Sequence, residues 1–280
     1  MAKKRYLVLA MAVYFILMVV LSRYDLDFSV RMTDGASALL IEAGRRIGPL
    51  PALLIPAFSL YTLGEFMKQP PLKVLSALLC AGAGYSITLP LLNEPVSVVL
   101  CLMFSVLIYN CLRMLPLPED TKKNRTILWI GVFCVAFGFL LIQLMKYIWG
   151  RPRYKAIVLE DAEFRTWLYI EGFEIRNDLY RSFPSAHAFC SAASFLLVFL
   201  PDLYPDESFR RSLCVLTAVL FTGFTMLSRI IASMHFISDV MAGTGLFLLT
   251  FLIAVLINWR TLYGQPEEKD PSVHDGTVRE

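Results

Sequence analysis

The chain of 280 residues is 57% hydrophobic and only 18% charged, whereas soluble globular domains are about 45–50% apolar and about 25% charged. Its formal net charge is +3, and it has no Lys/Arg-rich block with interleaved aromatic residues, so we expect no nucleic-acid partner. The composition excludes an ordinary soluble domain and indicates an integral membrane protein.

Eight apolar segments are candidate membrane spans, because a helix needs about 20 residues to cross the hydrocarbon core and open sheet edges are not tolerated there. They cover residues 6–22, 48–66, 72–92, 95–112, 126–146, 186–200, 212–231 and 236–258. We therefore predict an all-α, polytopic transmembrane bundle of about 6–8 spans. The first span follows Lys3, Lys4 and Arg5 without a small-x-small cleavage site, so we interpret it as a retained anchor.

Three regions are expected along the chain: N-terminal spans without a recognised motif over residues 1–125, a catalytic helical core over 126–258, and a polar tail over 259–280. The tail contains Pro266 and Pro271 and is expected to be disordered in the cytoplasm. Within the first region, residues 36–47 place leucines opposite Arg45 and Arg46, which predicts a short interfacial helix.

The six cysteines lie in or beside apolar segments and form no CxxC pair. We interpret them as free thiols packed like small hydrophobic residues, and we expect neither a metal nor a cofactor.

Lys and Arg residues predict the orientation, because they are retained in cytoplasmic loops. With the N-terminus inside, fourteen of them fall on the cytoplasmic side and ten outside, with Lys146 and Arg229 at membrane edges. Both termini are then cytoplasmic, and the two charged clusters described next share the outer face.

The first cluster occupies the loop after the fifth span. Lys146 and Arg153 are cations at the bilayer edge, where ionisable residues are costly and mark functional sites. Ser185 opens the next helix, where free backbone N–H groups favour an anion. His187, two residues further on, is placed to act as a general acid.

The second cluster lies in the hinge between the last two spans. His235 and Asp239 are four residues apart at a helix start and share one face, so the carboxylate is expected to hold Nδ1–H and leave Nε2 as a nucleophile. The guanidinium fork of Arg229, six residues earlier, suits phosphate oxygens. Cations, a nucleophile and an acid are what phosphoryl transfer requires.

These residues resemble the motifs of the type 2 phosphatidic acid phosphatase (PAP2) superfamily, which are K-x6-RP, PSGH and SR-x5-H-x3-D. The third motif is complete from Ser228-Arg229 through His235 to Asp239. The second reads Pro184-Ser185-Ala186-His187, with Ala in place of Gly, and the first runs from Lys146 to Arg153, followed by Tyr154 where the family has Pro. The resemblance covers roughly residues 126–258.

The resemblance implies a metal-independent lipid phosphatase with a phosphohistidine at His235, Asp239 as its relay and His187 as the leaving-group acid. It assigns the phosphate to Lys146, Arg153, Ser185 and Arg229. Undecaprenyl diphosphate, phosphatidylglycerophosphate, phosphatidic acid and lipid A are substrate classes that fit, and the oligomeric state is left open.

Other interpretations stay open at this point. Lys146 and Arg229 taken singly resemble snorkelling cations at span ends, and Arg151 and Arg181 are expected to be solvated. A lipid phosphotransferase of the same fold would use the same residues. A transporter is less favoured, because broken helices and paired half-chains are not visible.

Overall fold

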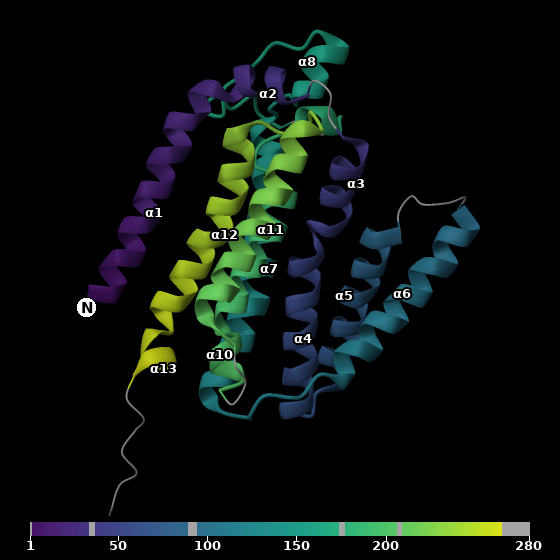
Figure 1. Ribbon diagram of the computed structural model, residues 1–280, viewed down its shortest axis with the longest axis vertical. Helices are drawn as coiled ribbons and strands as arrows, with labels where there is room; N and C mark the ends of the chain where they lie inside the picture. Colours follow the sequence, from purple (N-terminus) through teal and green to yellow (C-terminus); the bar gives the residue numbers. More distant parts are fainter. Residues whose placement is uncertain (1, 34–36, 89–93, 174–176, 206–208, 265–280) are drawn as a thin grey trace, which may run out of the picture.

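The computed structural model describes residues 2–33, 37–88, 94–173, 177–205 and 209–264. Within these ranges all regular structure is helical, and the long helices run side by side (Figure 1). The elements in chain order are α1 (Ala2–Leu21), η1 (Ser22–Tyr24), α2 (Asp25–Thr33), α3 (Ala38–Ile47), α4 (Leu50–Phe66), α5 (Pro70–Thr88), α6 (Glu94–Met114), α7 (Lys122–Trp149), α8 (Tyr154–Glu160), η2 (Asp178–Tyr180), α9 (Ala186–Ala192), η3 (Ala193–Phe199), α10 (Leu200–Leu203), α11 (Arg211–Ile231), α12 (Ile237–Ile257) and α13 (Trp259–Tyr263).

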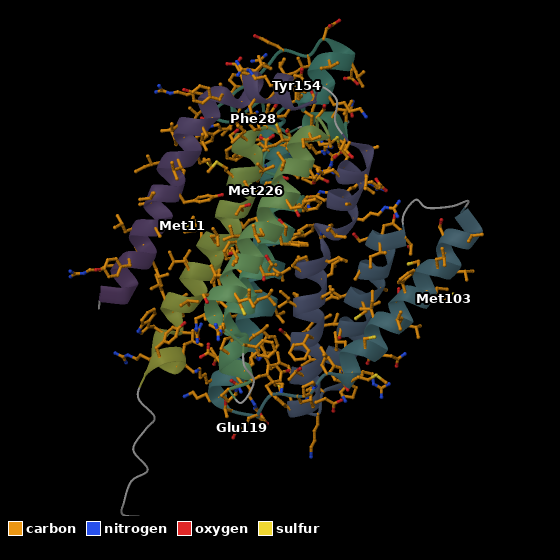
Figure 2. The ribbon with its side chains drawn as sticks, in the orientation of Figure 1. Met11, Phe28, Met103, Glu119, Tyr154 and Met226 are labelled. Atoms are coloured by element: carbon orange, nitrogen blue, oxygen red, sulfur yellow. The ribbon has the colours of Figure 1, made fainter. Side chains whose placement is uncertain are left out.

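Among the described residues, eight helical stretches are long and apolar enough to cross a membrane, which confirms the predicted bundle. They are Arg5–Thr33, Ala38–Phe66, Pro70–Thr88, Val96–Met114, Lys122–Glu160, Ala186–Leu203, Arg211–Ile231 and Ile237–Ile257. Figure 2 shows mostly carbon side chains around Met11 and Met226 in the middle of the bundle, with Tyr154 and Glu119 near its opposite ends. This distribution matches an apolar slab between two polar interfaces.

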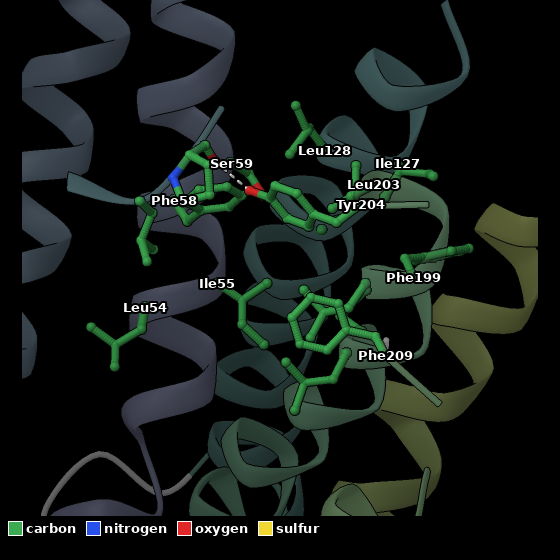
Figure 3. A pocket seen from close by; sticks show the side chains of 16 residues that line it. Leu54, Ile55, Phe58, Ser59, Ile127, Leu128, Phe199, Leu203, Tyr204 and Phe209 are labelled. Carbon is green, nitrogen blue, oxygen red and sulfur yellow. Dashed lines mark hydrogen bonds between the residues drawn. The ribbon is translucent and has the colours of Figure 1, made fainter. Parts of the chain in front are cut away.

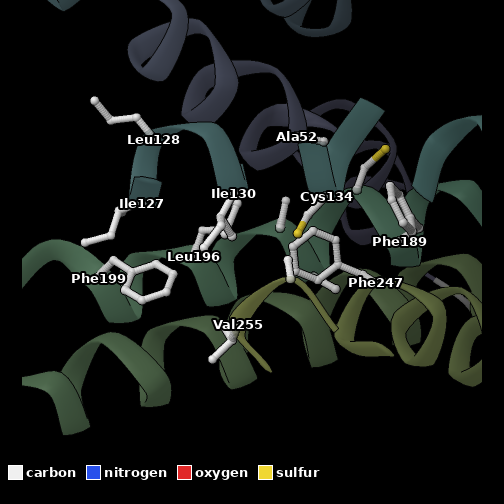
Figure 4. Close-up of a cluster of buried hydrophobic side chains, with 14 of the residues drawn as sticks. Ala52, Ile127, Leu128, Ile130, Cys134, Phe189, Leu196, Phe199, Phe247 and Val255 are labelled. Carbon is white, nitrogen blue, oxygen red and sulfur yellow. The ribbon is translucent and has the colours of Figure 1, made fainter. Parts of the chain in front are cut away.

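The core joins α4, α7, α9, η3 and α12 (Figure 4). Phe189 of α9 and Phe247 of α12 meet edge to face, with ring centroids 5.5 Å apart. Gly138 of α7 lies directly against the Phe189 ring, and Gly243 of α12 lies against the carbonyl group of Ser185, so that a Cβ at either glycine would overlap its neighbour. These two close approaches draw the start of α9 between α7 and α12, where the charged residues converge.

The span predicted at 186–200 consists of three consecutive segments, α9, η3 and α10, that end at Leu203. Within it, the Ser191 hydroxyl donates to the Ala188 carbonyl at 2.9 Å, and the Ser194 hydroxyl donates to the Ser191 carbonyl at 2.7 Å. Hydroxyl groups that bond back onto the preceding turn locally perturb a helix, and the 3₁₀ segment begins within this stretch.

The structure corrects the prediction of a short interfacial helix over residues 36–47. Ala38–Ile47 form α3, but α3 packs lengthwise on α11 and leads into α4 as one span (Figure 1). Gly44 faces Ser228 and Gly48 faces Thr225, each so closely that a Cβ would clash. Small residues let helix backbones approach in a membrane, so this face was suited to a neighbouring helix rather than to the bilayer surface.

The C-terminal tail, expected from residue 259, begins later. Trp259–Tyr263 form α13, in which Trp259 and Tyr263 pack with ring centroids 4.7 Å apart and Leu262 is buried in the core. The apolar residues of this turn therefore extend the folded bundle. Residues 265–280 lie outside the described residues.

Replacing Gly44 with alanine should destabilise the protein, because the added Cβ overlaps the Ser228 side chain. We expect a loss of about 1–3 kcal/mol, typical of overpacking, measured as a lower thermal unfolding temperature in detergent. Gly223→Ala in α11 is the matched control, since nothing lies within 4 Å of its Cβ position and alanine is the better helix former. Equal unfolding temperatures for the two variants would contradict the close α3–α11 contact.

Candidate active site

Four backbone hydrogen bonds bring the two charged clusters together at one end of the bundle. The α7 helix ends at Gly150, which adopts φ 58° and releases the chain into an extended segment. Arg153 N–H then donates to the Leu179 carbonyl at 2.7 Å, and Ser182 N–H donates to the Arg151 carbonyl at 2.9 Å. The remaining two bonds reach the hinge: Lys155 N–H donates to the Ser233 carbonyl and Ser185 N–H donates to the Asp239 carbonyl, both at 2.9 Å.

The three predicted phosphate cations are all buried. Lys146 lies in the last turn of α7 and donates from Nζ to the Arg181 carbonyl at 2.7 Å. Arg153 precedes α8 and pairs through Nη2 with Asp178, whose exposed carboxylate lies 2.7 Å away. Arg229 occupies the last turn of α11. Their convergence shows that Lys146 and Arg229 do not snorkel toward water.

Several side-chain nitrogen atoms at this end are buried without an acceptor in the described part of the chain. They are Nε of Arg153, Arg181 and Arg229, together with Nδ1 of His235. Buried polar groups are nearly always hydrogen-bonded, and guanidinium groups pair most strongly with carboxylate or phosphate oxygens. The guanidinium donors come from separate elements and are therefore suited to hold an anion, whereas Nδ1 of His235 faces Asp239.

His235 and Asp239 lie side by side as predicted, although His235 precedes α12 instead of sharing a helix face with Asp239, and they do not close a hydrogen bond. The distance from His235 Nδ1 to Asp239 Oδ2 is 3.7 Å, which exceeds a hydrogen-bond length. The carboxylate is already occupied, because Oδ1 accepts from Arg151 Nη1 at 2.5 Å and Oδ2 accepts from the Phe236 N–H at 2.8 Å and from the Ser182 hydroxyl. The pair is in position for the bond without making it in this arrangement.

Burial holds the pKa of His235 well below its ordinary value of 6.5, because an imidazolium would lose its hydration. The Asp239 carboxylate opposes this shift, while the nearby charges of Lys146 and Arg153 add to it. The His235 ring is therefore neutral at neutral pH, which is the state that a nucleophile requires.

Ser185 and His187 complete the predicted set at the start of α9. The Ser185 side chain is fully buried and caps α9 by accepting from the Ala188 N–H at 3.5 Å. The Ser185 backbone N–H donates to the Asp239 carbonyl. His187 is partly buried, and its ring has the backbone carbonyl of Arg45 in α3 as a hydrogen-bond partner. All seven predicted site residues are thus gathered at the same end of the bundle.

Arg151 corrects the expectation of a solvated cation, since it is only 1% exposed. Its Nη1 donates to Ser238 Oγ at 2.8 Å as well as to Asp239, and its Nε donates to the Arg165 carbonyl at 2.8 Å. The guanidinium also lies over the Phe236 ring, 4.4 Å from its centroid. Arg181 is likewise not free in solvent, because it stacks on Tyr147 at 5.1 Å.

Asp25 of α2 was not predicted as a site residue. It lies 213 residues before its partner Ser238 in the sequence. It is 1% exposed, and Oδ2 accepts from Arg151 Nη2 at 3.0 Å and from Ser238 Oγ at 2.5 Å. Oδ1 accepts from the Ser238 N–H at 2.9 Å. The available signal was an acidic residue directly after the first span, although no motif singled it out.

Aromatic residues of the 147–170 segment cover this network. Phe164 packs on Phe236 at 5.3 Å, and Trp149 and Trp167 pack on Phe183 at 5.2 and 6.0 Å. The Arg151 guanidinium lies 5.7 Å from the Phe164 ring centroid and 4.4 Å from that of Phe236, so these two rings shield its ion pairs from water and strengthen the electrostatic interactions.

A prominent cavity lies elsewhere. It measures about 450 Å³, is apolar, and is lined by residues of α4, the start of α7 and the α10–α11 region, including Ile55, Phe58, Leu128, Tyr204 and Phe209 (Figure 3). It holds none of the histidines or buried cations. A charged phosphate is therefore better matched to the histidine cluster than to this space.

The fold and the site together define a polytopic membrane protein with a cluster of buried cations and histidines at one end of its bundle. Residues 127–263 match the model of the PAP2 superfamily, so the chain carries a PAP2 superfamily domain, as the motifs predicted. Searches of curated proteins and of solved structures gave no match. The matched segment includes every predicted site residue and excludes Asp25 and Arg45.

Proposed function

We propose that this protein hydrolyses a lipid phosphate or diphosphate through a phosphohistidine formed on His235. PAP2 superfamily membership supports a phosphoric ester hydrolase in general, and the eight spans support an integral membrane protein. The observation that carries the proposal is the buried His235 at the same end of the bundle as guanidinium nitrogen atoms that lack an acceptor among the described residues. A phosphoryl group would satisfy those donors.

In the proposed reaction, Lys146, Arg153, Arg229 and the Ser185 hydroxyl hold the phosphoryl oxygens while Nε2 of His235 attacks phosphorus. The bond from phosphorus to the leaving oxygen breaks, and His187 gives that oxygen a proton. Asp239 stabilises the positive charge that develops on the ring once Nδ1–H swings the remaining distance toward it. Water then attacks the phosphohistidine, returns a proton to His187 and releases phosphate and free His235.

A lipid substrate is supported by the position of the site. The site residues lie on or next to the ends of the candidate spans α7, α9, α11 and α12, where a lipid headgroup would meet the hydrocarbon. Undecaprenyl diphosphate, phosphatidylglycerophosphate, phosphatidic acid and lipid A are the classes that fit such a site. In a phosphotransferase of the same fold, a lipid hydroxyl would replace water in the second step.

His235→Ala should abolish phosphate release from every lipid, because no covalent intermediate can form. The measurement is inorganic phosphate released from a panel of purified lipid phosphates and diphosphates, in the presence and absence of EDTA. Wild-type turnover should survive EDTA and be inhibited by vanadate. Full activity of His235→Ala on any lipid, or complete loss of wild-type activity in EDTA, would sink the proposed mechanism.

His187→Ala should retain more activity on a lipid diphosphate than on a lipid monophosphate. A phosphate leaving group needs less protonation than an alkoxide, so losing the general acid matters less for the diphosphate. The quantity compared is the residual kcat/KM of the variant relative to wild type on the two lipids. Equal losses on both would show that His187 does not protonate the leaving group.

We also propose that the active site faces the extracytoplasmic side of the cell (inner) membrane, as the distribution of Lys and Arg favours. Single cysteines at Asp161 and Glu119, in a background without the six natural cysteines, report the two ends of the bundle. Asp161 follows α8 near the site, and Glu119 lies in the α6–α7 connection. In intact cells a membrane-impermeant thiol reagent should label position 161 and spare 119, and the reverse pattern would invert the topology.

A further inference from the structure

A buried carboxylate outside the matched domain is connected to the site residues. Asp25 begins α2, which follows α1 and η1 and crosses the end of the bundle (Figure 1). The segment is anchored by the Tyr14 hydroxyl of α1, which donates to the Met241 carbonyl of α12 at 2.9 Å. Asp25 then enters the protein beside Arg151 and Ser238, whereas Asp27, two residues later, is exposed.

Arg151 distributes its guanidinium between two carboxylates from opposite ends of the chain. Nη1 binds Asp239 at 2.5 Å and Nη2 binds Asp25 at 3.0 Å, and all three side chains are 1% exposed or less. Ser238 stands between the carboxylates, accepting from Arg151 and donating to Asp25. One cation thus serves two anions in a region closed to water.

The charge balance of this group determines how strongly Asp239 acts on His235. A guanidinium paired with Asp239 alone would neutralise that carboxylate and weaken it as a partner for the imidazole. Asp25 supplies a second negative charge to the same guanidinium. The group of Arg151, Asp239 and Asp25 therefore carries one net negative charge, and it faces His235. The other charges facing His235 are Lys146 of α7 and Arg153 before α8, and both disfavour a positively charged ring.

We propose that Asp25 is a positioning residue for the His235 reaction, which acts through Arg151 to keep the Asp239 carboxylate anchored and fully charged toward the ring. The N-terminal segment would then be part of the catalytic unit rather than an anchor appended to it. The inference rests on the proposed function, and it concerns kcat rather than substrate binding, because Asp25 does not face the phosphate cations.

Asp25→Asn should lower kcat by roughly tenfold or more, less than the 10²–10³-fold loss typical of a direct charge-stabilising donor, with little change in KM. It should also move the acid limb of kcat/KM to lower pH. Removing the negative charge of Asp25 leaves Arg151 less compensated, which disfavours protonated His235 and keeps the nucleophile neutral at lower pH. Asp27→Asn, on the same helix, is the matched control and should match wild type in both readouts.

Two further variants separate positioning from mere support of the fold. Asp25→Glu keeps the charge and should leave the acid limb at its wild-type position, with kcat above that of Asp25→Asn. Adding Arg151→Gln to Asp25→Asn removes one positive and one negative charge, so its acid limb should return toward wild type. If Asp25→Asn alone is too unstable to purify, the effect of Asp25 can be measured in the Arg151→Gln background. There the kcat and the acid limb of Arg151→Gln are compared with those of the double variant.

The outcomes distinguish this inference from the proposed function. A wild-type protein that releases no phosphate from any lipid, or a fully active His235→Ala, would overturn the proposed function. Wild-type activity that depends on His235 and is unchanged in Asp25→Asn would overturn only the role of Asp25. The role of Asp25 would also be overturned if kcat fell only in proportion to the fraction of folded protein. In that case the acid limb would be unchanged in Asp25→Asn and between Arg151→Gln and the double variant.

Discussion

The buried guanidinium of Arg151 is the interaction on which the charged end of this bundle depends. An uncompensated charge in such an environment is prohibitively costly, and here the cation is matched by Asp239 and Asp25 and covered by the rings of Phe164 and Phe236. The same contacts tie the first span, the segment after α7 and the start of α12 into one unit. Removing any partner would leave a buried charge without its counterpart.

Around that ion group, the phosphate side of the site has the opposite character. Its cations converge with few anions between them, and Asp178 is an exposed carboxylate that occupies one fork of Arg153. In the proposed function, a bound phosphate would stabilise this excess of positive charge. One end of the bundle therefore contains a satisfied ionic group close to His235, beside guanidinium groups with nitrogen atoms that lack an acceptor among the described residues.

The apolar part of the bundle serves this arrangement through close helix contacts. Gly138, Gly243 and Gly44 allow Phe189, Ser185 and Ser228 to approach within distances that no side chain would permit. In a bilayer, where lipid tails are as apolar as leucine, such packing is a main source of helix association. The positions of Ser185 and Arg229 thus depend on glycines one to two helical turns away from the charged residues.

The sequence by itself determined the helical class, the approximate positions of the spans and the seven residues of the candidate site. Hydropathy is a local property, and the four-residue spacing of His235 and Asp239 predicted their proximity, although His235 precedes α12 and only Asp239 lies on the helix. The PAP2-like motifs supplied the rest, and their order along the chain identified the matched domain.

Only the tertiary structure decided which residues surround those seven. The contact of Asp25 with Ser238 joins positions 213 residues apart, and no local pattern reports such a contact. The sequence pattern of Arg151 indicated a flanking cation, but the fold buries it. The pattern of α3 indicated an amphipathic surface helix, but α11 packs against its glycines. Burial and pairing depend on which elements meet, and that is a property of the folded chain rather than of any segment.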